Sequence, residues 1–190
     1  MALNNSANVS TGKPKIGGAI YYAPEGTTLP TDATSDLDGA FENLGYVSDD
    51  GLTNANSIES ETIKAWGGDI VATSQTEKTD TFALKLIETL RVAVLKAIYG
   101  ADNVSGSTET GLVVKANVKE LQAASWVVDM VLNGNTLKRV VIPRGKISEL
   151  GDIVYKDDEA IGYEPTIEAL PDSLGNTHYE YIKTADIISA

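Results

Sequence analysis

The sequence predicts a mainly β protein of the α+β class that contains one helix. β-branched residues alternate with polar residues over most of the chain from Ser57 onward, which is the pattern of strands. One segment has apolar residues at helical spacing. The chain has 190 residues, of which 42% are apolar and 22% charged, so it can build one core of its own and is neither disordered nor fibrous.

The helix is expected over residues 89–100. Thr89 is a suitable N-cap residue, and Gly100 can adopt the left-handed conformation that ends a helix. The spacing of the apolar residues predicts that one helical face is buried. These residues are Leu90, Ala93, Val94, Ala97 and Ile98.

Turn signals divide the rest of the chain into strands. Gly67-Gly68 separates two strands within residues 57–84, and Asn133-Gly134 predicts a tight hairpin. A turn is also expected at residues 172–176. Further strands are expected at residues 16–22, 112–121, 125–132, 137–142, 152–155, 161–170 and 178–183.

The predicted strand at residues 125–132 is apolar on both faces. Trp126 and Val128 point to one side, and Val127 and Val131 point to the other. Antiparallel strands of a small domain usually leave one face in water, so the second face needs a cover. The sequence allows either the predicted helix or a neighbouring subunit in that role.

Residues 23–56 are predicted to form an unusually long loop. They contain three turn signals, and connections longer than about 12–15 residues without regular structure are uncommon in compact domains. A loop that lies in water would not need large apolar side chains. This segment nevertheless contains Leu29, Leu37, Phe41, Leu44 and Tyr46.

The sequence does not predict an enzyme, a metal site or a cofactor. His178 is the single histidine and there is no cysteine, so neither a histidine cluster nor a thiolate site can form. His178 is expected to be structural. Carboxylates in predicted turns could suggest calcium, but none has the spacing of a calcium loop, and turn carboxylates mostly accept hydrogen bonds from their own backbone. They are Asp36, Asp38, Asp49, Asp50, Asp157, Asp158 and Glu159.

The charge of the chain argues against nucleic-acid binding. There are 15 basic and 27 acidic side chains, which gives a net charge of -12, and the pI is about 4.4. A surface that binds phosphate would instead be basic. No segment has the apolar length of a membrane span, and the first residues lack a signal-peptide pattern, so synthesis in the cytoplasm is expected.

Two segments resemble the major tail (tail tube) protein of bacteriophages with long, non-contractile tails. The first reads Ala-Pro-Glu-Gly-Thr-Thr-Leu-Pro-Thr-Asp at 23–32, and the second reads Leu-Gly-Tyr-Val-Ser-Asp-Asp-Gly at 44–51. The similarity continues to Trp66-Gly67-Gly68-Asp69. In the second half of the chain the similarity lies only in the order of the predicted elements. A helix that ends in Tyr99-Gly100 is followed by strands.

The resemblance implies a β-sandwich with one flanking helix, in a single domain of residues 1–190 that begins with an N-terminal arm, residues 1–15. It also implies that six copies close into a ring, that rings stack into the tail tube of the virion, and that DNA passes through the lumen without specific binding. The implied partners are further copies of the chain, the tape measure protein, the tail terminator and the baseplate or tip proteins.

Within this interpretation, two sets of residues are candidates for contacts. The apolar residues of the 23–56 loop, Leu29, Leu37, Phe41, Leu44 and Tyr46, would contact the next ring, or alternatively fold back onto their own subunit. Acidic strand residues would line the lumen, namely Glu59, Glu61, Glu77 and Asp80. A monomeric carbohydrate- or calcium-binding adhesion module and a small hydrolase are the alternative functions. The hydrolase would need a pocket around His178 or a carboxylate pair.

Overall fold

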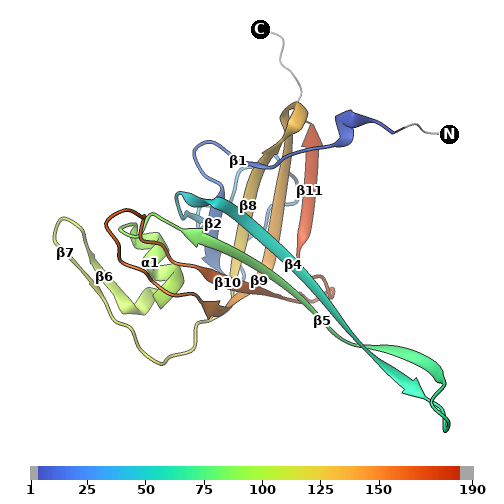
Figure 1. The fold of residues 1–190 in the computed structure, drawn as a ribbon. Helices are drawn as coiled ribbons and strands as arrows, with labels where there is room; N and C mark the ends of the chain where they lie inside the picture. Colours follow the sequence, from blue (N-terminus) through green and yellow to red (C-terminus); the bar gives the residue numbers. More distant parts are fainter. Residues whose placement is uncertain (1–3, 185–190) are drawn as a thin grey trace.

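The computed structural model describes residues 4–184, and most of its strands form one antiparallel sheet (Figure 1). The sheet order is β3-β2-β8-β9-β10-β5-β4, with β1 also paired to β8 and β11 to β9. The strands of this sheet are β1 (Lys13–Pro14), β2 (Ile20–Pro24), β3 (Glu42–Asn43), β4 (Val47–Lys64), β5 (Ile70–Leu86), β8 (Ala124–Leu132), β9 (Thr136–Leu150), β10 (Pro165–Leu170) and β11 (Tyr179–Thr184). A separate hairpin pairs β6 (Val104–Ser107) with β7 (Gly111–Val114).

The sheet curves so that its two halves enclose one core, which confirms the predicted β-sandwich with a helix. β9 belongs to both halves, because β11 pairs with its residues 136–141 and β10 with its residues 144–150. Phe82 of β5 and Trp126 of β8 share this core although two strands separate them in the sheet. Gly145 lies at the bend, where a Cβ atom would come 2.6 Å from the indole ring of Trp126.

Helix α1 (Val92–Tyr99) closes the open side of the sandwich. Its buried residues are Val94, Leu95, Ala97 and Ile98, and Gly100 ends it with a φ of 89°. The predicted start at Thr89 was wrong. Arg91 is the N-cap residue, and Leu90 is exposed, because the Arg91 amide hydrogen-bonds to Glu88 O and holds residues 88–91 in a turn.

Several predicted boundaries also need correction. Residues 152–155 are not a strand, and the strand expected at residues 112–121 ends at Val114. The predicted loop 23–56 is shorter, because β4 begins at Val47. The Asp49-Asp50-Gly51 turn signal is in fact a bulge: the partners of β5 jump from Val47 to Leu52, and Gly51 has a φ of 75°.

The N-terminal arm packs on its own subunit. β1 pairs with Met130 and Val131 of β8, and the side chain of Asn133 donates to Val9 O. Residues 1–3 of the predicted arm lie outside the described residues. Three short 3₁₀ helices complete the fold, at Ser6–Asn8, Ala101–Asn103 and Asn133–Asn135. In the described part of the chain, no helix is long and apolar enough to cross a membrane.

Candidate functional site

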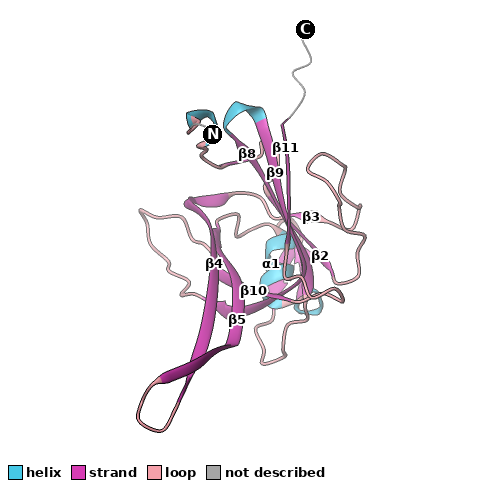
Figure 2. Cartoon of the chain, turned by 90° about the vertical axis from the view of Figure 1, so that its right-hand side faces the viewer, coloured by secondary structure: helices cyan, strands magenta, loops and turns pink. Residues whose placement is uncertain are grey.

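The β4–β5 hairpin projects from the sandwich as an arm (Figures 1 and 2). Residues 57–78, which we call the β4–β5 arm, are exposed on both faces, whereas β5 is buried on one face from Asp80 onward. The sequence predicted the two strands and the turn between them, but not the projection. A two-stranded hairpin without packing partners is marginally stable in water, so this arm is suited to packing on another molecule.

The two faces of the arm differ in charge. Glu59 lies opposite Glu77 in the antiparallel register, and Glu61 follows two residues later on the same face. Like charges in directly opposed positions destabilise a strand pair, so this acidic face is not explained by the stability of the arm. The other face continues the core-facing side of β4 and β5. It contains Ile58, Lys64, Ile70 and Lys78.

The tip of the arm is apolar and fully in solvent. Trp66 lies in the turn between β4 and β5 and is completely exposed. Nearby side chains on the two strands are about 60% exposed, namely Ile63, Ile70 and Val71. β4 and β5 have 18 and 17 residues and are longer than a small sandwich covers. The prediction placed residues 47–56 in a loop, so it missed the length of this hairpin and with it the exposed tip.

Asp80 closes the base of the arm and is not a lumen residue. Its side chain is buried, so this part of the predicted acidic set was wrong. Oδ1 accepts from the amide nitrogens of Asn54, at 2.7 Å, and Asn56, at 3.2 Å. Oδ2 accepts from Thr177 Oγ1 and lies 2.6 Å from Nδ1 of His178.

His178 is therefore part of a structural cluster. Besides its contact with Asp80, the ring packs edge-on against Phe82 at 5.3 Å between ring centres. Burial alone would raise the pKa of Asp80, but the hydrogen bonds from Thr177, Asn54 and His178 together outweigh it and lower the pKa. Because Thr177 donates to the same carboxylate, its hydroxyl is not placed as a nucleophile beside the imidazole ring.

The loop between β2 and β4 folds back onto its own subunit. Arg139 donates from NH1 to the backbone oxygens of Asp32, at 3.1 Å, and Ser35, at 2.8 Å. Ala33 is buried beside this anchor. Asp32 Oδ1 accepts three hydrogen bonds, from the backbone amides of Thr34 and Ser35 and from the hydroxyl of Thr34, and the backbone donors contribute most to lowering its pKa to about 2.

Arg139 is itself held by a buried ion pair with Asp129 of β8. Nε lies 2.6 Å from Oδ1 and NH2 lies 2.9 Å from Oδ2, and both side chains are almost fully buried. Val127 lies on the same face of β8 as Asp129 and is buried without any neighbouring subunit. Trp126 and Val128 lie on the opposite face, in the core that also contains the helix residues. The subunit therefore covers both faces of β8 by itself.

The apolar loop residues do not all remain available for contacts. Leu44 is fully buried in the core of its own subunit, so it was wrongly placed among the contact candidates. Leu29, Leu37 and Phe41 are half-buried, and Tyr46 is 74% exposed.

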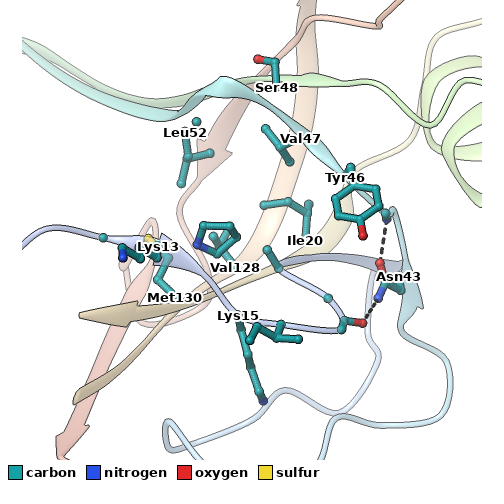
Figure 3. A pocket seen from close by; sticks show the side chains of 18 of the residues that line it. Lys13, Lys15, Ile20, Asn43, Tyr46, Val47, Ser48, Leu52, Val128 and Met130 are labelled. Carbon is teal, nitrogen blue, oxygen red and sulfur yellow. Dashed lines mark hydrogen bonds between the residues drawn. The ribbon is translucent and has the colours of Figure 1, made fainter. Parts of the chain in front are cut away.

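A groove lies between the segment from Gly12 to Ile20 and the start of β4, with a volume of about 620 Å³ (Figure 3). Its floor is apolar and consists of Ile20, Val47, Leu52, Val128 and Met130. Lys13, Lys15, Tyr46, Asp49 and Arg91 also line it. The sequence did not predict this groove, because it joins segments about 30 residues apart that pair in different parts of the sheet.

The structure offers no assembled site for chemistry in the residues that it describes. No group of three or more potential metal ligands occurs between residues 4 and 184. The groove is lined by neither His178 nor a glutamate. Asp38 accepts a hydrogen bond from the amide of Ala40, as expected for a carboxylate in a turn.

The model of the family described as "Phage tail tube protein" matches residues 1–188. The chain therefore belongs to the phage tail tube protein family, which confirms the resemblance seen in the sequence and gives the chain a structural role in a phage tail tube. A search of curated proteins found no match.

Proposed function

We propose that six copies of this chain close into a ring and that stacked rings form a tube through which phage DNA passes. The observation that carries the proposal is the β4–β5 arm, which is exposed on both faces and needs a packing partner. Symmetric contacts between identical subunits require only one pair of complementary surfaces, and a head-to-tail contact that closes produces a ring. The role is that of a structural virion protein and not an enzyme.

The proposed partners follow from the same role. Besides further copies of the chain, they are the tape measure protein inside the tube, the tail terminator at one end and the baseplate or tip proteins at the other. The chain would be made in the host cytoplasm and act in the virion tail.

Electron microscopy of the purified protein tests this proposal. We expect rings or tubes of uniform diameter, with six subunits per ring in class averages, and a matching mass in analytical ultracentrifugation. A chain that stays monomeric at all concentrations and salt conditions would contradict the proposal and would favour a monomeric binding module.

The acidic face of the arm, with Glu59, Glu61 and Glu77, is proposed to line the lumen. Repetition around each ring and along the tube would maintain a negative surface although salt screens each charge within about 8 Å. The double variant Glu59→Lys/Glu61→Lys should form normal tubes but slow DNA ejection. The matched control Asp36→Lys/Asp38→Lys makes the same change of charge on the exposed β2–β3 loop. Ejection at an equal rate in both variants would contradict the lumen assignment.

Residues Phe41 and Tyr46 of the β2–β4 segment are proposed to contact the next ring. Phe41→Ala should leave the melting temperature of the subunit nearly unchanged and shorten the tubes. Leu44→Ala is the matched control, because Leu44 is fully buried and its truncation should cost about 2–3 kcal/mol of unfolding free energy. Thermal melts and tube lengths on micrographs separate the two roles. Full-length tubes from Phe41→Ala would rule out the contact.

A further inference from the structure

The arm tip lies at one end of β4 (Figure 1), and the other end of β4 contributes residues to the groove. β4 contributes Val47 and Leu52 to the groove and then runs to Lys64, next to the tip. Twelve residues of extended chain separate Leu52 from Lys64, which corresponds to roughly 40 Å. The tip therefore cannot reach the groove of its own subunit while the hairpin stays paired.

We propose that the arm tip of one copy docks in the groove of a second copy, with Trp66 inserted above the apolar floor. This inference rests on the proposed self-assembly of the chain. The occupant is a second copy because the two surfaces complement each other. The tip has exposed apolar side chains, and on the floor of the groove the apolar residues Val47, Leu52 and Met130 are only partly buried. Two different surfaces at opposite ends of a subunit make a head-to-tail contact, which can repeat through an assembly.

The sizes of the two surfaces agree. The groove, with a volume of about 620 Å³, has room for a tryptophan side chain, and burial of such a side chain removes about 150–250 Å² from water. Met130 on the floor is a flexible, polarisable side chain that packs well against aromatic rings. Ile16, which lies on the rim and is almost completely exposed, would also be covered by the docked tip.

The charges of the two surfaces are also complementary. The groove is lined by Lys13, Lys15 and Arg91 against the single carboxylate of Asp49. Of the four carboxylates on the arm, Glu59, Glu61 and Glu77 lie on the face proposed to line the lumen, and Asp69 lies in the turn at the tip, where it can meet the groove. Arg91 pairs with Glu88 and Lys15 with Asp129 in the subunit. Lys13 is thus the groove cation without a carboxylate partner among residues 4–184. Docking would bring the carboxylate of Asp69, at the tip of the arm, close to the amine of Lys13.

Tryptophan fluorescence tests the burial of the tip in the unmodified protein. The chain has two tryptophans, of which Trp126 is buried in the subunit and Trp66 is exposed. We expect acrylamide to quench one tryptophan in free subunits and neither in assembled tubes, with a shift of the emission to shorter wavelength on assembly. Tubes in which Trp66 remains as accessible as in free subunits would overturn the docking while leaving the proposed tube intact. A failure to form any assembly would instead contradict the proposed function.

Disulfide crosslinking tests where the tip docks, in a chain that has no cysteine of its own. The variant Asp69→Cys/Ser48→Cys places one thiol at the tip and one beside the groove and leaves Trp66 in place. Oxidised tubes should give a ladder of linked chains on a non-reducing gel. The matched control Asp69→Cys/Val118→Cys uses a fully exposed residue on another part of the surface. Equal or stronger crosslinking in the control would overturn the assignment to the groove.

Discussion

Replacing Arg139 by Met is expected to lower the unfolding free energy of the subunit by about 3–5 kcal/mol. The substitution keeps an unbranched apolar stem but leaves the buried carboxylate of Asp129 with Lys15 as its remaining cation, at 3.3 Å and partly in solvent. It also removes the two hydrogen bonds from Nη1 of Arg139 to the backbone oxygens of Asp32 and Ser35. The β2–β3 loop should therefore exchange its amide protons faster in the variant. Urea denaturation and hydrogen exchange measure the two effects.

Two variants serve as controls for this prediction. Arg144→Met removes an equally short ion pair, to Glu25, but both side chains are about half exposed, so its cost should be below 1 kcal/mol. The double variant Asp129→Leu/Arg139→Met leaves no buried charge and should recover part of the lost stability. If Arg139→Met costs no more than Arg144→Met, the buried pair does not anchor the loop.

The ion pair illustrates how much of the structure the sequence could predict. The Asn133-Gly134 signal and the alternation in 125–132 gave the β8–β9 hairpin, and its register places Asp129 opposite Arg139. The connection has three residues, Asn133–Asn135, whereas a two-residue Asn-Gly turn would place Lys138 opposite Asp129. The prediction therefore gave the two strands but not the register that forms the pair. The carbonyls of Asp32 and Ser35 could not be predicted as partners of Arg139 either, because they come from a loop about 100 residues away whose position depends on tertiary packing.

The misassigned residues have a similar explanation. Asp80 alternates with Phe82, Leu84 and Leu86, so the same periodicity that predicted strand β5 already placed its side chain on the core face. Net charge led to its inclusion in the lumen set, although period-two alternation is the stronger signal. The three glutamates retained in that set are Glu59, Glu61 and Glu77. They lie closer to the tip of the hairpin than Asp80, where β4 and β5 leave the sandwich (Figure 1). Where the sandwich ends depends on how far its sheet curves, which local sequence does not encode.

Local sequence patterns could not predict the groove, for a different reason. Its floor joins residues of β2, β4 and β8. β4 pairs with β5 alone, whereas β2 pairs with β3 and β8, so no predicted hairpin brings the two sides together. Only the curvature of the whole sheet does so.

Replacing Asp80 by Ala is expected to destabilise the subunit by about 3–5 kcal/mol at neutral pH, because several buried donors lose the charged group that accepts from them. Asn54 and Asn56 come from β4, whereas Thr177 and His178 precede β11. The carboxylate thus joins the base of the arm to the C-terminal strand. Asp80→Asn, which keeps the shape but not the charge, should cost less than Asp80→Ala. Equal costs would show that the shape of the side chain and not its charge matters.

The pH dependence of stability gives an independent test of this network. The pKa of Asp80 is lowered in the folded subunit, so its stabilising contribution is present above the ordinary aspartate pKa of 3.8 and is lost as the pH falls through the lower, folded value. The difference in unfolding free energy between the wild type and Asp80→Asn should therefore shrink as the pH falls below about pH 4. Urea denaturation across this range measures the difference. A difference that persists unchanged below pH 3 would mean that the network does not depend on the charge of Asp80. The base of the arm would then be held by the backbone pairing of β4 with β5 and by the packing of Phe82 alone.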